Sequence, residues 1–349
     1  MEKAYRTKDK SYDGVFFLAV RSTGIFCKPS CSARKPLPEN VEYYPTAHEA
    51  ISAGYRPCQR CHPLNGQDTT PDWVERLLTL IDKNTSVKYS DAALRSLGVE
   101  PARARRYFRK NYGMTFQAYC RGRRLGKSLE KIRLGSNLDD VVLGHGYNSY
   151  SGFRDAFTKT FGNPPGKSRS SECILTSWIE SPIGPLITAA TSDGICLLEF
   201  SDQRRIEGQV SSLRRHFNCA IVPGSNKHIE QLHNELKSYF ENKLKKFSVK
   251  IVYPGTTFQR KVWNELLRIP YGTTVSYAEV ARRIQLPGAS RAVGTANGLN
   301  RIAIVIPCHR VVNKDGNLGG YGGGVWRKKM LLDLEQGVRQ FNVEPEGTN

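Results

Sequence analysis

The alternation of apolar and polar residues changes twice along the chain. Across 73–169, apolar positions recur at three- to four-residue spacing, as at 93–97 and 153–161, which is typical of amphipathic helices. Residues 174–252 combine strand-like apolar runs with a helix near 227–241. From residue 256 helices and short loops return, and the apolar run at 302–306 predicts a buried strand.

Two polar stretches rich in proline and glycine mark the seams between these parts. HPLNGQDTTPD (62–72) and FGNPPGKSRSSE (161–172) have the composition of linkers. At 349 residues the chain is long enough for several domains, each with its own core. We therefore expect a multidomain α+β protein with units at 1–66, 72–169, 173–252 and 253–340.

The middle unit contains two similar pairs of helices with recognisable ends. Ser90 can cap the first helix, and Pro101 can open the second. Asn137 can cap the corresponding helix of the second pair. The second helices, at 101–111 and 149–160, carry basic residues, and such pairs are typical of helix-turn-helix DNA binding. The alternative is an all-helical packing domain whose arginines are merely solvated.

Charge and cysteine content narrow the function. The formal net charge is +20 and is spread over all parts of the chain, which favours a polyanionic partner, namely DNA or RNA. A basic protein without a nucleic-acid role is the alternative. No apolar run is long enough to span a membrane, so we expect no membrane association and a cytoplasmic protein. In that compartment the nine cysteines should be reduced rather than disulfide-bonded.

Four cysteines near the N-terminus form two close pairs. Cys27 and Cys31 are separated by three residues, Cys58 and Cys61 by two, and 26 residues lie between the pairs. This spacing suits tetrahedral thiolate coordination of one Zn²⁺. The plain interpretation is a zinc ion that only holds a small domain together. His62 could replace one of the four thiolates, although four cysteines already complete the set.

A second chemical motif, IPCHRV, occupies residues 306–311. Cys308 follows an apolar run and precedes His309 and Arg310, and a neighbouring base or cation favours the reactive thiolate. A core cysteine at a strand end is the plain alternative. A cysteine hydrolase is another, but adjacent cysteine and histidine are unusual for hydrolases, and no oxyanion-hole motif is apparent.

The first unit resembles a known family. Residues 13–61, including FCKPSC and YRPCQRC, look like the N-terminal domain of the Ada family of DNA repair proteins and regulators. By that resemblance Cys27 is both a zinc ligand and the acceptor of a methyl group from a methylated DNA phosphate. Zinc would hold the sulfur deprotonated and still nucleophilic.

The middle unit, at about 73–169, resembles the AraC-type regulators. The resemblance implies two recognition helices, at 101–111 and 149–160, that enter DNA grooves. Candidate DNA-contacting residues on them are Arg103, Arg106, Ser151 and Arg154.

The last unit, at about 175–337, resembles the O6-alkylguanine-DNA alkyltransferases, which have a mixed α/β subdomain and a helical active-site subdomain. The resemblance makes Cys308 the alkyl acceptor and His309 the base that acts through a water molecule. Glu335 would orient His309, and Asn300 would support the site.

Three further residues acquire roles from the same resemblance. Tyr277 and Arg291 would turn the damaged nucleotide out of the duplex, with Arg291 filling the vacated space, and Tyr321 would line the base pocket.

Together the three units resemble the Ada family along one chain. The expected activity is that of a methylated-DNA–protein-cysteine S-methyltransferase that uses each cysteine once, with O6-methylguanine and O4-methylthymine as substrates at Cys308. Methylation of Cys27 would switch on promoter binding, with double-stranded DNA and RNA polymerase as partners. The rivals are a zinc-containing AraC-type transcription factor with an inactive alkyltransferase domain, and a repair protein that does not activate transcription.

Overall fold

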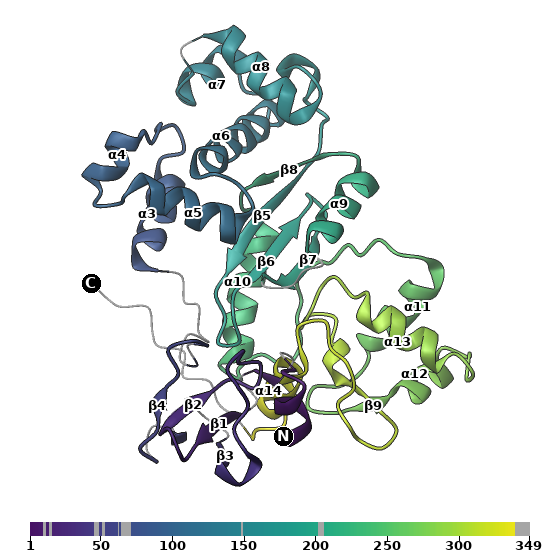
Figure 1. Ribbon diagram of the computed structural model, residues 1–349. Helices are drawn as coiled ribbons and strands as arrows, with labels where there is room; N and C mark the ends of the chain where they lie inside the picture. Colours follow the sequence, from purple (N-terminus) through teal and green to yellow (C-terminus); the bar gives the residue numbers. More distant parts are fainter. Residues whose placement is uncertain are drawn as a thin grey trace.

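The computed structural model describes residues 1–9, 12–13, 16–44, 49–50, 53–61, 63, 71–147, 149–201 and 206–338. His62, most of the predicted linker at 62–72 and the end of the last predicted unit beyond residue 338 lie outside these ranges. Figure 1 shows a small β-sheet near the N-terminus, a group of helices, and a larger sheet with its own helices. Within the described ranges, no helix is long and apolar enough to cross a membrane.

The N-terminal unit is built on a four-stranded sheet in the order β3-β1-β2-β4. Strands β2 and β4 run parallel, with Ile25 opposite Arg56 and Phe26 opposite Pro57, so both strands end at the same edge of the sheet. A short helix, α1, precedes the sheet, and a 3₁₀ turn, η2, precedes β3. The bounds are α1 Glu2–Arg6, β1 Phe17–Val20, β2 Ile25–Cys27, η2 Pro38–Asn40, β3 Val41–Tyr44 and β4 Arg56–Pro57.

The middle unit is helical, and several of its helices begin or end at the predicted residues, although α3 was not predicted. The side chain of Ser90 accepts a hydrogen bond from the backbone N–H of Ala93, and that of Asn137 accepts one from Asp139. Pro101 opens α5, and Gly113 closes it with a left-handed φ of 67°. The bounds are α3 Asp72–Lys83, α4 Asp91–Ser96, α5 Pro101–Tyr112, α6 Phe116–Arg133, α7 Leu138–Gly144, α8 Tyr150–Phe161 and η3 Pro165–Lys167.

The next unit is a four-stranded sheet in the order β7-β6-β5-β8 with helices beside it. Strands β5, β6 and β7 match the predicted apolar runs, and α10 matches the predicted helix. Helix α9 was not predicted, because Leu213 is the only fully buried residue among its described side chains and the apolar period is weak. The bounds are β5 Cys173–Ile179, β6 Leu186–Ala190, β7 Ile195–Phe200, α9 Ile206–Phe217, β8 Ala220–Pro223 and α10 Lys227–Phe240.

The C-terminal helices share one hydrophobic core with this sheet. Leu198 of β7, Trp263 of α11, Val293 of α13 and Leu331 of α14 are all buried in that cluster. The shared core fixes the active-site helices relative to the sheet. The bounds are α11 Thr257–Leu266, β9 Val275–Ser276, α12 Tyr277–Arg283, α13 Ser290–Gly298, η4 Cys308–Arg310, β10 Val311–Val312 and α14 Val325–Glu335.

The strand predicted at 302–306 is wrong. Apart from an isolated bridge between Ile302 and Leu198, the run forms buried turns, and Ile304 has a φ of 69°. The side chain of Asn300 replaces a strand partner: its Nδ2 donates to the carbonyl of Ile306 at 2.9 Å, and its Oδ1 accepts from the N–H of Ile302 at 3.0 Å. The apolar residues at 302–306 correctly predicted that this run is buried, but they carry no information about the hydrogen bonds of the Asn300 side chain.

The helical unit packs directly on the larger sheet. Trp178 of β5 lies against Tyr112, the last residue of α5, with ring centroids 4.2 Å apart. Helix α6 lies along β8, as Figure 1 shows, and a Cβ added to Gly122 would be 2.7 Å from Pro223 Cδ. Glycine on α6 therefore permits a helix-to-strand approach that a larger residue would prevent.

This packing predicts that Gly122→Ala destabilises the protein. Alanine normally stabilises a helix relative to glycine by about 1 kcal/mol. Here its Cβ must displace Pro223, and overpacking costs about 1–3 kcal/mol, so we expect a lower Tm. The matched control is Gly208→Ala in α9, where an added Cβ meets no atom within 4 Å and the Tm should rise. Thermal denaturation of both variants checks the prediction, and a Tm that rises in both would contradict it.

Candidate active sites

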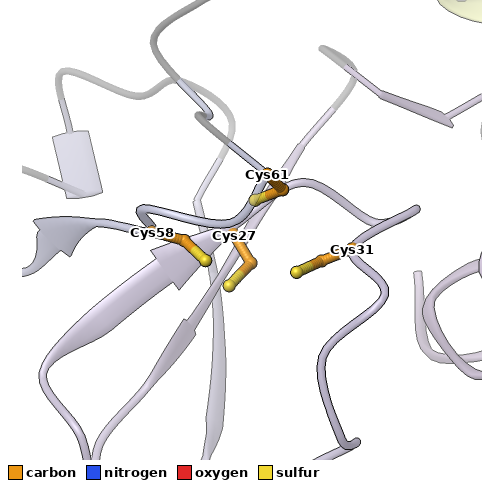
Figure 2. A group of neighbouring side chains, drawn as sticks. All are labelled: Cys27, Cys31, Cys58 and Cys61. Atoms are coloured by element: carbon orange, nitrogen blue, oxygen red, sulfur yellow. The ribbon is translucent and has the colours of Figure 1, made fainter.

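The first site is the four-cysteine cluster. The sulfurs of Cys27, Cys31, Cys58 and Cys61 all lie within 4.8 Å of one another, and Figure 2 shows them pointing toward a common centre. Cys27 is the last residue of β2 and Cys58 directly follows β4. Because these strands are parallel, their ends place the two sulfurs side by side, and the turns that follow bring in the other two.

This cluster fits a zinc ion. Tetrahedral Zn–S bonds of about 2.3 Å put sulfurs roughly 3.8 Å apart, and the observed grouping is compatible with that spacing. Cys27, Cys31 and Cys58 are buried, and Cys61 is half-buried. The ligand set predicted from the spacing is thus brought together by the fold.

Backbone N–H groups distinguish the four sulfurs. Lys28 N–H donates to Cys61 Sγ and Arg60 N–H donates to Cys58 Sγ, both at 3.4 Å. Burial raises the pKa of Cys31, and the backbone N–H of Ala33 opposes that shift. Among the described residues, no backbone N–H donates to Cys27. Because such bonds withdraw charge from a thiolate, Cys27 keeps a more electron-rich sulfur than Cys58 and Cys61.

Asp13 also holds the site together and was missed from the sequence. Its carboxylate accepts hydrogen bonds from Ser30 N–H at 2.9 Å and from Ser30 Oγ at 2.5 Å. Ser30 lies in the loop between Cys27 and Cys31, so Asp13 fixes that loop. Its position 14 residues before Cys27 gives no sequence signal of this contact.

The candidate DNA-contacting residues lie on the two predicted recognition helices. Arg103 and Arg106 are exposed on α5, and Ser151 and Arg154 are exposed on α8. The guanidinium of Arg103 also lies 4.9 Å from the centre of the Trp73 ring. All four are accessible to a ligand, and their contacts with bases stay a prediction.

The second site surrounds Cys308, which begins the 3₁₀ turn η4. Its residue is 5% exposed, and Asn300 Nδ2 donates to its sulfur at 3.1 Å. The side chain of Asn297 donates to its carbonyl oxygen at 3.2 Å. Asn300 thus both organises the preceding turns and orients the sulfur. The sequence predicts that Cys308 follows the end of a strand, but in the structure the residue lies in a turn.

A buried carboxylate links the residues that follow Cys308. His309 Nε2 donates to Glu335 Oε1 at 2.8 Å, and Arg310 donates to both carboxylate oxygens at 2.8 and 2.9 Å. Tyr239 Oη donates to Oε1 at 2.8 Å, and Gly272 N–H donates to Oε2 at 3.1 Å. Arg310 therefore braces the turn from inside the protein rather than facing DNA.

The protonation states follow from burial and charge. Burial raises the pKa of Glu335, but His309 and Arg310 lower it by more, so the net pKa lies below the ordinary value and the carboxylate is ionised. Burial lowers the pKa of His309 against the opposing effect of Glu335. Since Arg310 already balances the carboxylate, we assign a neutral His309 with its proton on Nε2. Its Nδ1 is then an unprotonated base, and it has no hydrogen-bond partner among the described residues.

Lys328 is a further charged residue of this site that sequence reasoning missed. It is fully buried, and its Nζ donates to the carbonyl of Val311 at 2.5 Å. Burial lowers the pKa of Lys328 to about 8, and the nearby Cys308 opposes that shift. Lys328 precedes Glu335 by seven residues on α14, two helical turns, so a shared helix face was the available signal.

The residues predicted to handle the damaged base lie on three separate elements, and Tyr277 is the one with a described interaction with Cys308. Tyr277 is the first residue of α12. Its pKa is raised, mainly by burial and to a smaller extent by the charge of Cys308. Arg291 is exposed at the start of α13. Tyr321 lies in the glycine-rich loop before α14, with its ring centre 6.5 Å from that of Phe200. The structure places these side chains, and their roles stay predictions.

Four family models match the chain in sequence order. Residues 1–64 match the metal binding domain of Ada, and residues 94–171 match a helix-turn-helix domain. Residues 174–253 match the ribonuclease-like domain of 6-O-methylguanine DNA methyltransferase, and residues 257–337 match the DNA binding domain of the same family.

Curated relatives extend the match over nearly the whole chain. The chain is 35% identical over 336 residues to "Bifunctional transcriptional activator/DNA repair enzyme Ada" of Escherichia coli K12, covering 94% of this chain and 93% of that protein. It is 33% identical over 341 residues to "Regulatory protein ada" of Salmonella typhimurium, covering 95% and 94%. A crystal structure of Mycobacterium tuberculosis O6-methylguanine methyltransferase covers 47% of this chain and 93% of its own, with 41% identity and a TM-score of 0.42.

The metal-binding, helix-turn-helix and methyltransferase models occur together here, and the full-length relative shares more than 30% identity across nearly all of both chains. The four clustered cysteines and the buried Cys308 site lie within the matched regions. On this evidence, the chain belongs to the Ada family of methylated-DNA–protein-cysteine methyltransferases and transcription regulators.

Proposed function

We propose that this protein removes methyl groups from DNA at two separate cysteines and that one of these transfers controls its binding to promoters. Cys308 would accept the methyl group of O6-methylguanine, and also of O4-methylthymine. Cys27 would accept the methyl group of a DNA phosphotriester. The observation that carries the proposal is the hydrogen bond between His309 and the buried Glu335, directly after Cys308 in the chain, in a site where Asn300 donates to the Cys308 sulfur.

The transfer at Cys308 needs a thiolate and an accessible methyl carbon. The thiol proton passes through a water molecule to His309 Nδ1, and Glu335 stabilises the imidazolium that forms. The sulfur then attacks the methyl carbon, the bond from carbon to O6 breaks, and guanine leaves after taking up a proton at N1. A thioether is a poor leaving group, so the cysteine is used once.

The base must leave the duplex to reach Cys308, because the site is buried and the O6 methyl group lies within the base stack. Tyr277 and Arg291 begin α12 and α13, and Arg291 is exposed. These positions support the assignment in which Tyr277 rotates the nucleotide's phosphate and Arg291 occupies the vacated space. Tyr321 would then lie against the extruded base.

At the other site, Cys27, Cys31, Cys58 and Cys61 would hold zinc, which would keep the sulfurs deprotonated at neutral pH. The lack of a backbone N–H donor to Cys27, among the described residues, supports this residue as the acceptor. Its sulfur displaces the phosphotriester oxygen at the methyl carbon, leaving a phosphodiester and a thioether. The exposed basic residues on α5 and α8 would read the promoter, and RNA polymerase would be the partner recruited there.

We predict that Cys308→Ser abolishes transfer from O6-methylguanine and spares phosphotriester repair. A serine hydroxyl is a far weaker nucleophile than a thiolate, so the rate should fall by roughly 10³-fold or more. Cys27→Ser should show the reverse pattern. The measurement is mass spectrometry of tryptic peptides after reaction with DNA carrying either lesion.

Cys196→Ser is the matched control for this experiment, because Cys196 is a buried cysteine of the same domain on β7. It should transfer both methyl groups at the wild-type rate. Recovery of the guanine-derived methyl group on Cys196 or Cys219 would refute the assignment of Cys308.

The second prediction concerns pH. Because burial lowers the pKa of His309, its imidazole stays neutral below the ordinary value of about 6.5. The initial rate at Cys308 should therefore hold from pH 8 to about 6.5 and decline only below that. For the same reason the free energy of unfolding should begin to fall as the pH drops below about 6.5, where the unfolded chain takes up a proton that folded His309 refuses.

Initial rates of transfer from O6-methylguanine across this range check the prediction. Transfer to Cys27 in the same samples controls for any effect of pH on DNA binding. A rate at Cys308 that declines with a midpoint at or above pH 6.5 would mean that His309 is not a neutral base with a lowered pKa.

The third prediction is that methylation of Cys27 raises promoter affinity. Conversion of one thiolate to a thioether removes a negative charge from the cluster. Coulomb's law gives roughly 0.6 kcal/mol for each DNA phosphate at about 7 Å in water. Several phosphates bring the gain to about 1–3 kcal/mol, a factor of about 5 to 150 in affinity.

Binding titrations on one promoter, at two salt concentrations, compare unmodified protein with protein methylated at Cys27. The gain should shrink at high salt because exposed charges are screened. Protein methylated only at Cys308 is the control and should bind like unmodified protein. Equal affinities, or a gain that requires methyl-Cys308, would exclude the switch.

A further inference from the structure

Arg327 is a buried arginine next to the methyl-transfer site that neither the sequence motifs nor the proposed mechanism uses. It is the third residue of α14 and is 4% exposed. Its Nε donates to the carbonyl of Ile183 at 2.7 Å, and its Nη1 donates to the carbonyl of Gly323 at 2.9 Å. One guanidinium thus joins two segments that are 140 residues apart in the chain.

The surroundings of the guanidinium leave it little freedom. It lies 4.1 Å from the centre of the Phe200 ring and 4.5 Å from that of Trp326. On another side, a Cβ added to Gly184 would be 2.7 Å from Nη2. The planar group is therefore enclosed by aromatic rings and a glycine turn, and only arginine offers a fork that can stack and reach both carbonyls.

The two segments that Arg327 joins differ in function. Ile183 and Gly184 belong to the turn between β5 and β6, in the α/β subdomain. Gly323 belongs to the loop at 319–324 that carries Tyr321. A Cβ on Gly323 would be 2.5 Å from Phe200 and 2.9 Å from Tyr321, so this part of the loop is packed tightly between the two rings.

The start of the loop lies beside residues of the Cys308 site. A Cβ on Gly319 would lie 3.4 Å from Tyr277 Oη, which places the start of the loop against Tyr277. Lys328, the residue after Arg327, donates to the carbonyls of Val311 and, at 3.5 Å, Gly320. The loop is thus held at both ends by neighbouring residues of α14. Phe200 packs against it from the α/β subdomain, and Arg327 adds hydrogen bonds that join it to the same subdomain.

We propose that Arg327 is a positioning residue that fixes this loop as a rigid wall of the base pocket and so sets which O6-alkyl groups the protein accepts. The inference rests on the proposed function, in which Cys308 accepts the alkyl group and Tyr321 lines the base pocket. A fixed wall holds a methylated base closely against the sulfur. A loosened wall loses that closeness but admits a larger alkyl group.

The test uses the full-length chain with Arg327→Lys and Arg327→Met. Lysine keeps the charge but has no planar fork, and methionine keeps much of the volume without donors. The substrates are two DNA duplexes of one sequence, one with O6-methylguanine and one with O6-benzylguanine. The measurement is the second-order rate constant of transfer to Cys308, with the modified peptide identified by mass spectrometry.

We expect the rate constant for the methylated duplex to fall by about 10- to 100-fold, because misplacement of about 1 Å has effects of that size. The benzylated duplex should lose much less, so the benzyl-to-methyl ratio should rise by about 5-fold or more. With the methylated duplex, the Arg327 variants should mainly raise the DNA concentration that gives half the maximal rate. The maximal rate should change less, since Cys308 and His309 are untouched.

The matched control is Arg301→Lys. Arg301 also ties the helical subdomain to the α/β subdomain, through Ser212 Oγ at 3.1 Å, and that hydrogen bond does not involve the 319–324 loop. It should lower the Tm without changing the substrate ratio. Equal losses for both substrates in the Arg327 variants, an unchanged ratio, or the same change in Arg301→Lys would overturn the proposal.

The experiment distinguishes failure of the Arg327 proposal from failure of the proposed function and from loss of folding. If wild-type protein carried no alkyl group on Cys308, the proposed function would fail before Arg327 was tested. If Arg327→Met did not fold, Arg327→Lys would still decide the matter, because it retains the charge and a donor toward the same carbonyls.

Discussion

The buried ion pair between Glu335 and Arg310 is the interaction on which the Cys308 site depends. A lone carboxylate inside a protein is costly, and this one is tolerated because Arg310 supplies a matching charge through two hydrogen bonds. Arg310 also donates to the carbonyl of Ile269 at 2.7 Å, which ties the pair to the end of α11. With its charge balanced, Glu335 can orient His309 without forcing a proton onto it. The arginine of the CHR sequence thus makes a neutral histidine compatible with an ionised glutamate.

The zinc site depends on a different constraint, namely parallel pairing of two very short strands. Strands β2 and β4 pair over two residues each, yet that pairing fixes where Cys27 and Cys58 meet. Among the described residues, backbone N–H groups then donate to two of the four sulfurs, those of Cys58 and Cys61. The two sites therefore prepare their thiols by different means: one balances charge inside a protein core, and the other concentrates thiolates and relies on a metal to hold them.

The sequence allowed much of this to be predicted, and the failures have a common cause. Residue spacing identified the four zinc ligands, and Ser90, Pro101 and Asn137 located the starts of three helices of the middle unit. Spacing failed where a long-range contact decides the conformation. The turns at 302–306 exist because Asn300 bonds their backbone and Ile304 adopts a positive φ, and neither leaves a periodic signal. Asp13, Lys328 and Arg327 went unnoticed because their partners are distant in the chain or lie in unremarkable loops.

Trp178 makes the packing of the methyltransferase half depend on the helical half of the protein. It belongs to the first strand of the methyltransferase half, yet its ring packs with the aromatic cluster that supports the end of α5, the first predicted recognition helix. If one half were replaced by that of a relative, the interface would contain a cavity or an exposed aromatic ring. Matching changes at Tyr112 and Gly122 would be needed to restore the packing. A change at either ring is therefore expected to require a compensating change at the other.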